Sequence, residues 1–371
     1  MKILADQNMP LVEAFFSPLG EIIRFDGRSL TPEQAKDADV LLTRSVTNVN
    51  EALLAQNTQL KFVGTATIGV DHIDQTYLQS RNVPFSSAPG CNSIAVAEYV
   101  LSAIFALAQE QHFSVFEKTI AIVGVGSIGQ CLADKLAAVG VKTLLVDPPR
   151  QARGDNGNWH ELDDALAQSD IVTFHVPLVK EGQHCTYHLL DKARIDALAA
   201  NKIVINASRG DVIDNQALLA RQQEHDDLCL VLDVWENEPD ILEELIPFVE
   251  LASVHIAGHT LEGKGRGTLM LYQALCQHLD IAPSSSLVDH LPTPSLQTLT
   301  LSDTWSLDEL GSLVHLIYDV RRDDAILRAQ LQSHGFDVLR KNYPVRRELS
   351  TLKLTGSNPN LNALAAFGFS I

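Results

Sequence analysis

Short apolar runs recur along the first ninety residues, and polar segments long enough for helices or turns separate them. The runs cover residues 2–6, 21–25, 39–45, 60–67 and 83–89. This spacing is typical of βαβ units, in which parallel strands alternate with helices. The N-terminal part of the chain is therefore expected to form a parallel sheet.

A second series of apolar runs follows, and these runs are rich in Val and Ile without strict alternation. They cover residues 119–124, 142–147, 170–177, 202–208, 228–235 and 251–258. Strands that are buried on both faces have this composition. Between the two series, residues 92–111 predict a helix that opens on an Asn or Ser cap and is apolar over a wide face. The pattern thus predicts two α/β sheets in succession, joined through a helix.

The pattern changes after residues 281–296, where Pro, Ser and Asp are frequent, as at a linker or domain edge. Charged residues then increase, and residues 315–331 read as helical. We expect a third, small α+β domain of roughly 80 residues, within the usual domain range.

Composition limits the function classes. A chain of 371 residues with 46% hydrophobic content is long enough for several domains. Its formal charge of -18 argues against general affinity for nucleic acid or an anionic membrane, so an anionic ligand needs a local basic pocket. The five cysteines are odd in number and lack a CxxC pair, which favours a reducing cytoplasm. No signal-peptide core opens the chain, and no apolar run reaches about 18 residues. We expect a soluble cytoplasmic protein.

A glycine motif carries the cofactor prediction. Gly124, Gly126 and Gly129 follow a predicted strand and open a predicted helix in G-x-G-x-x-G spacing. Such glycines permit a tight turn, the approach of a pyrophosphate and close packing of helix on strand. Asp147 ends the next strand, where a carboxylate can accept hydrogen bonds from ribose hydroxyls and repels a 2'-phosphate. NAD is favoured over NADP, and a glycine-rich turn in an unrelated α/β fold is the alternative.

Three side chains follow later strands, at the sheet edge where open α/β sheets bind ligands. Arg209 can hold a carboxylate through two parallel hydrogen bonds, or it is a surface arginine in a turn before a helix capped by Asp214. Glu238 precedes a proline and by itself reads as a solvated helix start. His255 by itself reads as a satisfied core histidine. All three occur beside a dinucleotide motif, and together they meet the needs of hydride transfer from an alcohol. Arg209 can anchor the substrate, His255 oriented by Glu238 can act as the base, and the nicotinamide can accept the hydride.

A metal site is not predicted. His255 and His259 have the H-x-x-x-H spacing of a zinc pair, but that pair requires a helix. The intervening Ile-Ala-Gly is a poor helix interior and contains no glutamate.

The motifs GVGSIG, NASRGDVIDNQAL, LDVWENEP and HIAGHT occur in an order that resembles the D-isomer-specific 2-hydroxyacid dehydrogenases. The resemblance implies two Rossmann-like, doubly wound parallel-sheet domains: residues 1–95 plus 260–285 bind substrate, and residues 96–259 bind NAD. It also implies that Arg209 orients the substrate carboxylate, Glu238 supports His255, and His255 takes the hydroxyl proton. The resemblance further implies that Asp233 helps to hold the nicotinamide.

A longer resemblance covers the whole chain and includes RSVTNVN, APGCNSIAVAEYV, HLIYDVRRDDAILR and LRKNYPVRRE. It points to members that oxidise a small phosphorylated 2-hydroxyacid in vitamin B6 biosynthesis, and it implies that residues 286–371 form a dimerisation domain in a homodimer. The implied substrate contacts are Ser45, Thr67 and His259. The implied NAD-site residues are Gly124, Gly126, Ser127, Ile128, Gly129, Asp147, Val176, Ala207, Ser208, Arg209, Asp233 and Gly258.

Two positions depart from the family pattern. His259 stands where a tyrosine is expected, which introduces a group that titrates near neutral pH. Val176 stands where a threonine is common, which matters little if NAD contacts only the backbone there.

The substrate phosphate requires cations, and the candidates are Arg44, Lys264 and Arg266. The alternative for the GKGRG run, residues 263–267, is a flexible solvated loop. The arginines of YPVRRE, residues 343–348, are interpreted as a solvated charged face rather than as groups that reach a neighbouring active site. Rival functions are another family member, such as a 3-phosphoglycerate dehydrogenase, and a regulatory protein that senses NAD.

Overall fold

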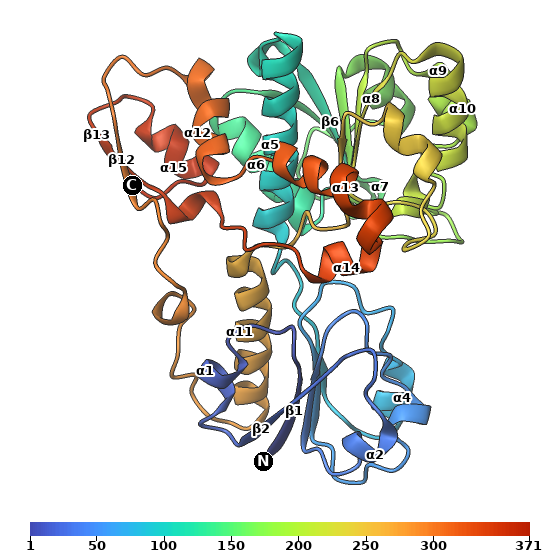
Figure 1. Ribbon diagram of the computed structural model, residues 1–371, viewed down its shortest axis with the longest axis vertical. Coiled ribbons are helices and arrows are strands. Elements are labelled where there is room, and N and C mark those ends of the chain that lie inside the picture. Colours follow the sequence, from blue (N-terminus) through green and yellow to red (C-terminus); the bar gives the residue numbers. More distant parts are fainter. The chain divides into compact units, whose positions relative to one another are not determined.

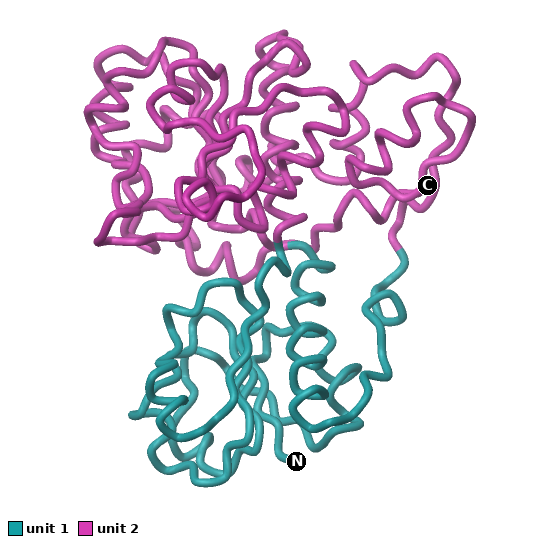
Figure 2. Tube along the Cα trace, turned by 180° about the vertical axis from the view of Figure 1, so that it is seen from behind, with its two compact units in different colours: residues 1–92, 260–293 teal, residues 93–259, 294–371 magenta.

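The computed structural model describes residues 1–371 and divides the chain into two compact units (Figure 2). Unit 1 comprises Met1–Asn92 and Thr260–Thr293, and unit 2 comprises Ser93–His259 and Pro294–Ile371. The chain therefore leaves unit 1, forms part of unit 2, returns to unit 1 and ends in unit 2.

Unit 1 contains a five-stranded parallel sheet with the strand order β2-β1-β3-β4-β5. The strands are β1 (Lys2–Asp6), β2 (Glu21–Phe25), β3 (Val40–Thr43), β4 (Phe62–Thr65) and β5 (Phe85–Ser86). The helices are α1 (Val12–Phe16), α2 (Pro32–Ala35), α3 (Glu51–Leu54), α4 (Gln75–Ser80) and α11 (Leu261–His278). The first predicted series of strands is confirmed.

The side chains of successive residues in these strands point to opposite faces of the sheet, as the two-residue period of a β-strand requires. Ile3 packs in one core with Phe15 of α1 and Tyr272 of α11. Leu4, the next residue, packs in a second core with Leu53 of α3 and Leu78 of α4. Both faces of the sheet are thus covered by helices, which explains why the strands read as continuous apolar runs (Figure 1).

Unit 2 contains a six-stranded parallel sheet with the order β11-β10-β9-β8-β6-β7. The strands are β6 (Thr119–Val123), β7 (Lys142–Val146), β8 (Ile171–Phe174), β9 (Ile203–Asn206), β10 (Cys229–Leu232) and β11 (Leu251–Ala252). The helices around it are α5 (Ser93–Gln111), α6 (Ser127–Ala138), α7 (Pro148–Ala152), α8 (Leu162–Gln168), α9 (Lys192–Ala197) and α10 (Asn215–His225). The second series of strands is confirmed. Strand β6 lies between β7 and β8, so the turn that follows β6 lies where the strand order reverses.

Helix α5 matches the helix that the pattern predicts. By length and composition it is the one helix that could cross a membrane, but 78% of its apolar window is buried inside the protein. Leu101, Ile104 and Leu107 belong to the core of unit 2. Helix α5 is therefore the core helix of this unit.

The C-terminal segment of unit 2 contains a two-stranded parallel sheet and four helices. The strands are β12 (Thr298–Leu301) and β13 (Lys353–Gly356), and the helices are α12 (Leu310–Ile317), α13 (Arg321–His334), α14 (Phe336–Lys341) and α15 (Leu361–Phe367). Its core is continuous with that of α5, and the rings of Phe367 and Phe105 lie 6.5 Å apart. The expected α+β character is present, whereas a separate third domain stays a prediction. The helical pattern at 315–331 is interrupted because Tyr318 has an extended backbone that ends α12.

Candidate active site

The glycine turn after β6 has the shape that a dinucleotide requires. Gly124 has a φ of +88°, and a Cβ placed on it would lie 2.8 Å from the His175 carbonyl oxygen. A Cβ on Gly129 would lie 2.1 Å from the Gly124 carbonyl oxygen, so the third glycine lets α6 pack on the turn. A Cβ on Gly126 would meet nothing within 4 Å. Gly126 therefore faces open space at the start of α6, as the glycine beside a bound pyrophosphate must.

Asp147 fastens this turn to the end of β7. One carboxylate oxygen accepts a hydrogen bond from the Val125 N–H at 2.8 Å, and the other accepts one from the Arg150 N–H at 2.9 Å. The Arg150 guanidinium in turn donates to the Val125 carbonyl oxygen at 2.8 Å. Each carboxylate oxygen has a second lone pair, so Asp147 can still accept from ribose hydroxyls. The hydrogen bond from the Val125 N–H of the turn to Asp147 is not predictable from the sequence pattern.

A carboxylate–histidine pair lies at the carboxyl edge of the same sheet. Nδ1 of His255 and Oε2 of Glu238 are 2.7 Å apart, and the Trp235 N–H donates to Oε1 of Glu238 at 3.0 Å. Burial alone would raise the pKa of Glu238, but His255, the Trp235 N–H and Arg340 outweigh burial and hold this pKa below its usual value. Glu238 is thus an ionised acceptor that orients the ring of His255.

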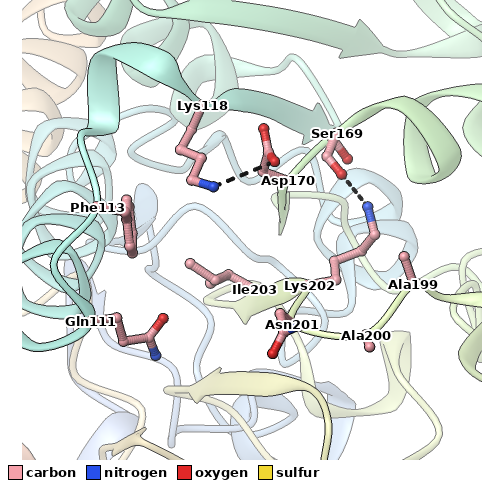
Figure 3. Close-up of a pocket in the computed structure, with 10 residues that line it drawn as sticks. All are labelled: Gln111, Phe113, Lys118, Ser169, Asp170, Ala199, Ala200, Asn201, Lys202 and Ile203. Atoms are coloured by element: carbon pink, nitrogen blue, oxygen red, sulfur yellow. Dashed lines mark hydrogen bonds and ion pairs between the residues drawn. The ribbon is translucent and has the colours of Figure 1, made fainter.

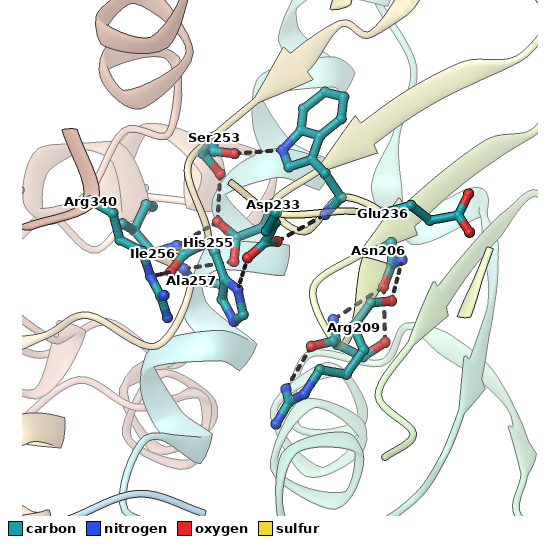
Figure 4. A network of polar contacts seen from close by, with 12 residues as sticks. Asn206, Arg209, Asp233, Glu236, Ser253, His255, Ile256, Ala257 and Arg340 are labelled. Atoms are coloured by element: carbon teal, nitrogen blue, oxygen red, sulfur yellow. Dashed lines mark hydrogen bonds and ion pairs between the residues drawn. The ribbon is translucent and has the colours of Figure 1, made fainter. Parts of the chain in front are cut away.

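Arg209 and this pair line one open cavity of about 240 Å³. The other lining residues are Gly210, Asp211, Trp235 and Asn237. The Arg209 guanidinium donates to the Ser208 carbonyl oxygen at 2.7 Å (Figure 4). The structure thus brings together the three side chains that the sequence singled out, and Glu238 is not the start of a helix.

Asp233 organises the backbone that carries His255. Its carboxylate is buried and accepts hydrogen bonds from the Ser253 hydroxyl at 2.7 Å, the Ile256 N–H at 2.7 Å and the Ala257 N–H at 2.9 Å. Burial raises its pKa, while His255 and the three donors act in the opposite direction. Both carboxylate oxygens bind this loop, so Asp233 orders the backbone of residues 253–257.

His255 itself lies beyond the end of β11 rather than within a strand. Its φ is +57°, a left-handed conformation that is uncommon for residues other than glycine. Its N–H donates to the Asp233 carbonyl oxygen at 2.7 Å. The surrounding hydrogen bonds therefore fix a conformation that the residue type does not favour.

A second cluster joins the two loops that carry Arg209 and Glu238. Nε2 of His188 lies 2.7 Å from Oε1 of Glu236, and the Asn215 N–H donates to Oε2 at 2.8 Å. His188, Asp214 and Glu236 place potential metal ligands within 4.8 Å of one another. Both ring nitrogens of His188 face carboxylates, those of Asp214 and Glu236. We therefore interpret this cluster as a set of polar contacts that connect the two loops rather than as a metal centre.

The remaining NAD-site predictions fall on the same edge of unit 2. Val176 follows β8 and lies against Gly124, while Ala207 and Ser208 follow β9. Gly258 follows the loop that Asp233 holds. The ring of His259 meets that of Tyr343 edge-on, with centroids 6.0 Å apart. The imidazole at this position thus has an aromatic neighbour from the C-terminal segment.

Unit 1 contains the predicted substrate contacts Ser45 and Thr67. Ser45 is exposed just after β3, and Thr67 follows β4 with its hydroxyl donating to the Gly69 carbonyl oxygen at 2.8 Å. Both residues lie at the carboxyl edge of the unit 1 sheet, where ligands of such sheets bind.

Two of the three predicted phosphate cations, Arg44 and Arg266, lie near Cys91. Burial raises the pKa of the Cys91 thiol to about 11, and the charges of Arg266 and Arg44 both act against this rise. The Arg266 Nε donates to the Cys91 carbonyl oxygen at 2.9 Å. The alternative of a flexible GKGRG loop is wrong, because these residues form the first turns of α11, capped by Thr260.

Another hollow, of about 230 Å³, lies at the opposite edge of the unit 2 sheet (Figure 3). Lys118 and Asp170 form an ion pair there at 3.6 Å, and Lys202 donates to the Ser169 carbonyl oxygen. These residues stand at the amino ends of β6, β8 and β9. The hollow is therefore distinct from the edge that carries the glycine turn and His255.

Comparisons with known proteins agree with this geometry. Residues 97–260 match the family model of the D-isomer specific 2-hydroxyacid dehydrogenase, NAD binding domain, which confirms the predicted cofactor class. Residues 290–368 match a domain of unknown function, DUF3410. The chain resembles a solved structure of NAD⁺-bound 3-phosphoglycerate dehydrogenase from Entamoeba histolytica with a TM-score of 0.63 and 21% identity, over 76% of this chain and 95% of that one. This likeness confirms the fold.

Sequence relatives are much closer. The chain is 60% identical to erythronate-4-phosphate dehydrogenase from Pseudoalteromonas translucida over the full length of both proteins. It is 50% identical to the enzyme of the same name from Tolumonas auensis, over 100% of this chain and 99% of that one. The chain therefore belongs to the erythronate-4-phosphate dehydrogenases, within the D-isomer-specific 2-hydroxyacid dehydrogenase family.

Proposed function

We propose that the protein oxidises 4-phospho-D-erythronate to 2-oxo-3-hydroxy-4-phosphobutanoate with NAD, as a step in vitamin B6 biosynthesis. The observation that carries the chemistry is the 2.7 Å pair of His255 and Glu238 in the cavity that Arg209 lines. The name of the full-length relatives supports the choice of substrate.

The proposed base is Nε2 of His255. Glu238 accepts a hydrogen bond from Nδ1–H, so the lone pair of the neutral ring lies on Nε2, where it can accept the proton of the C2 hydroxyl. The imidazolium that forms is then stabilised by the ionised Glu238. NAD, when bound, accepts the hydride from C2.

The substrate carboxylate is assigned to Arg209. A guanidinium binds a carboxylate through two parallel hydrogen bonds, which fixes the orientation of the adjacent C2 atom. The Arg209 guanidinium donates one hydrogen bond, to the Ser208 carbonyl oxygen. Reorientation of one side chain is therefore enough to present its donors to a ligand.

The substrate phosphate is assigned to Arg44 and Arg266 in unit 1, together with Ser45 and Thr67 as further substrate contacts. The opposing effect of both arginines on the Cys91 thiol supports a local positive potential in an otherwise acidic protein. We also propose that the protein is a cytoplasmic homodimer and that residues 286–371 contribute the dimer contact. The acidic surface and the absence of paired cysteines are consistent with this location.

Replacement of His255 by Asn tests the mechanism. The variant should bind NAD as the wild type does, while turnover of 4-phospho-D-erythronate falls by roughly 10²–10⁴-fold, the usual contribution of a general base. The control is Gln330→Ala, an exposed position on α13, which should keep wild-type turnover. Wild-type turnover by the His255→Asn variant would show that His255 is not the base and has a structural role.

A further inference from the structure

The C-terminal segment reaches the loop that carries His255. Arg340, on α14, donates through Nε to the His255 carbonyl oxygen at 3.2 Å, and Arg346 donates through Nη1 to the Ala257 carbonyl oxygen at 3.0 Å. Figure 4 shows Arg340 extending toward the backbone of His255, Ile256 and Ala257. Two carbonyl groups of the loop are therefore held by residues that lie more than eighty positions further along the chain.

Arg346 is built into the core and does not belong to a solvated charged face, so the sequence-based interpretation of YPVRRE is wrong for this residue. Only 2% of Arg346 is exposed. Its guanidinium stacks on the Tyr318 ring at 3.7 Å and also donates to the Ala95 carbonyl oxygen. A buried guanidinium is costly unless its donors are used. Nη1 and Nη2 of Arg346 each have a carbonyl partner, whereas Nε is buried without one. The two hydrogen bonds join the C-terminal segment to the His255 loop and to α5.

The two arginines complement Asp233. Asp233 accepts hydrogen bonds from the N–H groups of His255, Ile256 and Ala257, through its carbonyl and carboxylate oxygens. The arginines hold carbonyl groups of the same three-residue stretch. Asp233 thus binds N–H groups of the loop and the two arginines bind its carbonyl groups. These hydrogen bonds stabilise the left-handed conformation of His255.

We propose that Arg340 and Arg346 are positioning residues for the proposed base, so that the C-terminal segment completes the catalytic loop within the same chain. This inference rests on the proposed function of His255. Neither arginine needs to contact substrate in this role. Arg340 also acts on the pair electrostatically, because its charge helps to hold the pKa of Glu238 below its usual value, against the larger effect of burial.

The test compares Arg340→Gln, Arg340→Lys and Arg346→Met with the wild type in single-turnover NADH formation. A displacement of the base by about 1 Å can lower the rate of the chemical step up to about 10²-fold. We expect kcat to fall by roughly 10- to 100-fold in Arg340→Gln and Arg346→Met, with NAD affinity within about threefold of wild type. Arg340→Lys retains a donor and a charge, so it should recover part of the rate. The acid limb of the pH–rate profile should also move to higher pH in Arg340→Gln, because the loss of a positive charge beside Glu238 favours protonation of the His255–Glu238 pair.

Two controls separate positioning from general damage. Lys341→Gln removes an exposed cation from the same helix and should leave kcat unchanged. Leu354→Ala opens a cavity in the buried core of the C-terminal segment and should lower the melting temperature without slowing NADH formation at 25 °C. Equal loss of kcat in Leu354→Ala and Arg346→Met, or wild-type kcat and pH profile in Arg340→Gln, would overturn the proposal. Failure of the wild type itself to reduce NAD would instead overturn the proposed function.

Discussion

Glu238 serves two hydrogen-bond donors at once, and this makes Glu238→Gln a sharp perturbation of the site. Oε1 accepts from the Trp235 N–H, and Oε2 accepts from Nδ1 of His255. Glutamine is nearly isosteric but offers one oxygen and one amide group. If its oxygen keeps the Trp235 N–H, the amide must donate to Nδ1, and the proton of the neutral ring moves to Nε2. The proposed base then presents a proton where it needs a lone pair.

The size of the effect follows from these contacts. A hydrogen bond to a charged group contributes about 1.5–3 kcal/mol, which is roughly 10- to 150-fold in rate if it is lost at the transition state. A wrong histidine tautomer costs more, and the corresponding Asp→Asn change in a serine protease lowers turnover about 10⁴-fold. We therefore expect kcat of Glu238→Gln to fall by roughly 10²–10⁴-fold.

The assay is stopped-flow formation of NADH from 4-phospho-D-erythronate between pH 5.5 and 9, with NAD affinity measured in parallel by calorimetry. Glu238→Asp is the matched variant, because it keeps the charge and shortens the reach by one methylene, and it should lose less activity than Glu238→Gln. The melting temperature reports whether either variant is unfolded. Activity of Glu238→Gln within twofold of wild type, with an unchanged acid limb, would refute the assignment of Glu238 as the partner of the base.

Three further predictions concern the cofactor turn, stability and substrate binding. Gly126→Ala should keep the melting temperature but weaken NAD binding by at least about tenfold, because its Cβ meets only the space assigned to the pyrophosphate. Gly129→Ala should lower both the melting temperature and the affinity for NAD. Equal melting temperatures for the two variants would contradict this prediction. Burial lowers the pKa of His175 to about 3 in the folded protein. As the pH falls below about 6.5, His175 is protonated in the unfolded chain but stays neutral in the folded one. The free energy of unfolding should therefore decrease by about 2 kcal/mol between pH 7.5 and pH 5. Denaturant titrations at pH 7.5 and 5 should show a smaller loss in His175→Gln, and an equal loss would exclude His175 as the source. Arg266→Ala should raise KM for the phosphorylated substrate with little change in kcat, and an unchanged KM would remove Arg266 from the phosphate site.

Much of the fold was predictable because buried parallel strands leave a strong sequence signal. Every predicted strand of the two series is present, and their apolar character follows from helices on both sheet faces. The helical pattern at 315–331 was less informative. Apolar periodicity continues through Tyr318, and only tertiary contacts such as the Tyr318–Arg346 stack show why the chain turns there.

The candidate site also has a part that the sequence predicts and a part that it does not. Arg209, Glu238 and His255 were found because each follows a strand of one sheet, and the carboxyl ends of parallel strands share an edge. The left-handed backbone of His255 and the buried Asp233 network have no pattern in the sequence, since they depend on contacts between separate loops. Arg346 was misread because a run of charged residues normally faces solvent. Two carbonyl groups and an aromatic ring contact its buried guanidinium, while its Nε has no hydrogen-bond partner.

The most direct measurement is NAD reduction by the purified protein with 4-phospho-D-erythronate and, separately, with 3-phospho-D-glycerate. The proposed function predicts a clear preference in kcat/KM for the four-carbon acid. A preference for 3-phospho-D-glycerate would keep the mechanism but contradict the substrate assignment. No reduction with either acid, in a protein that still binds NAD, would contradict the enzymatic function and favour a regulatory, NAD-sensing role.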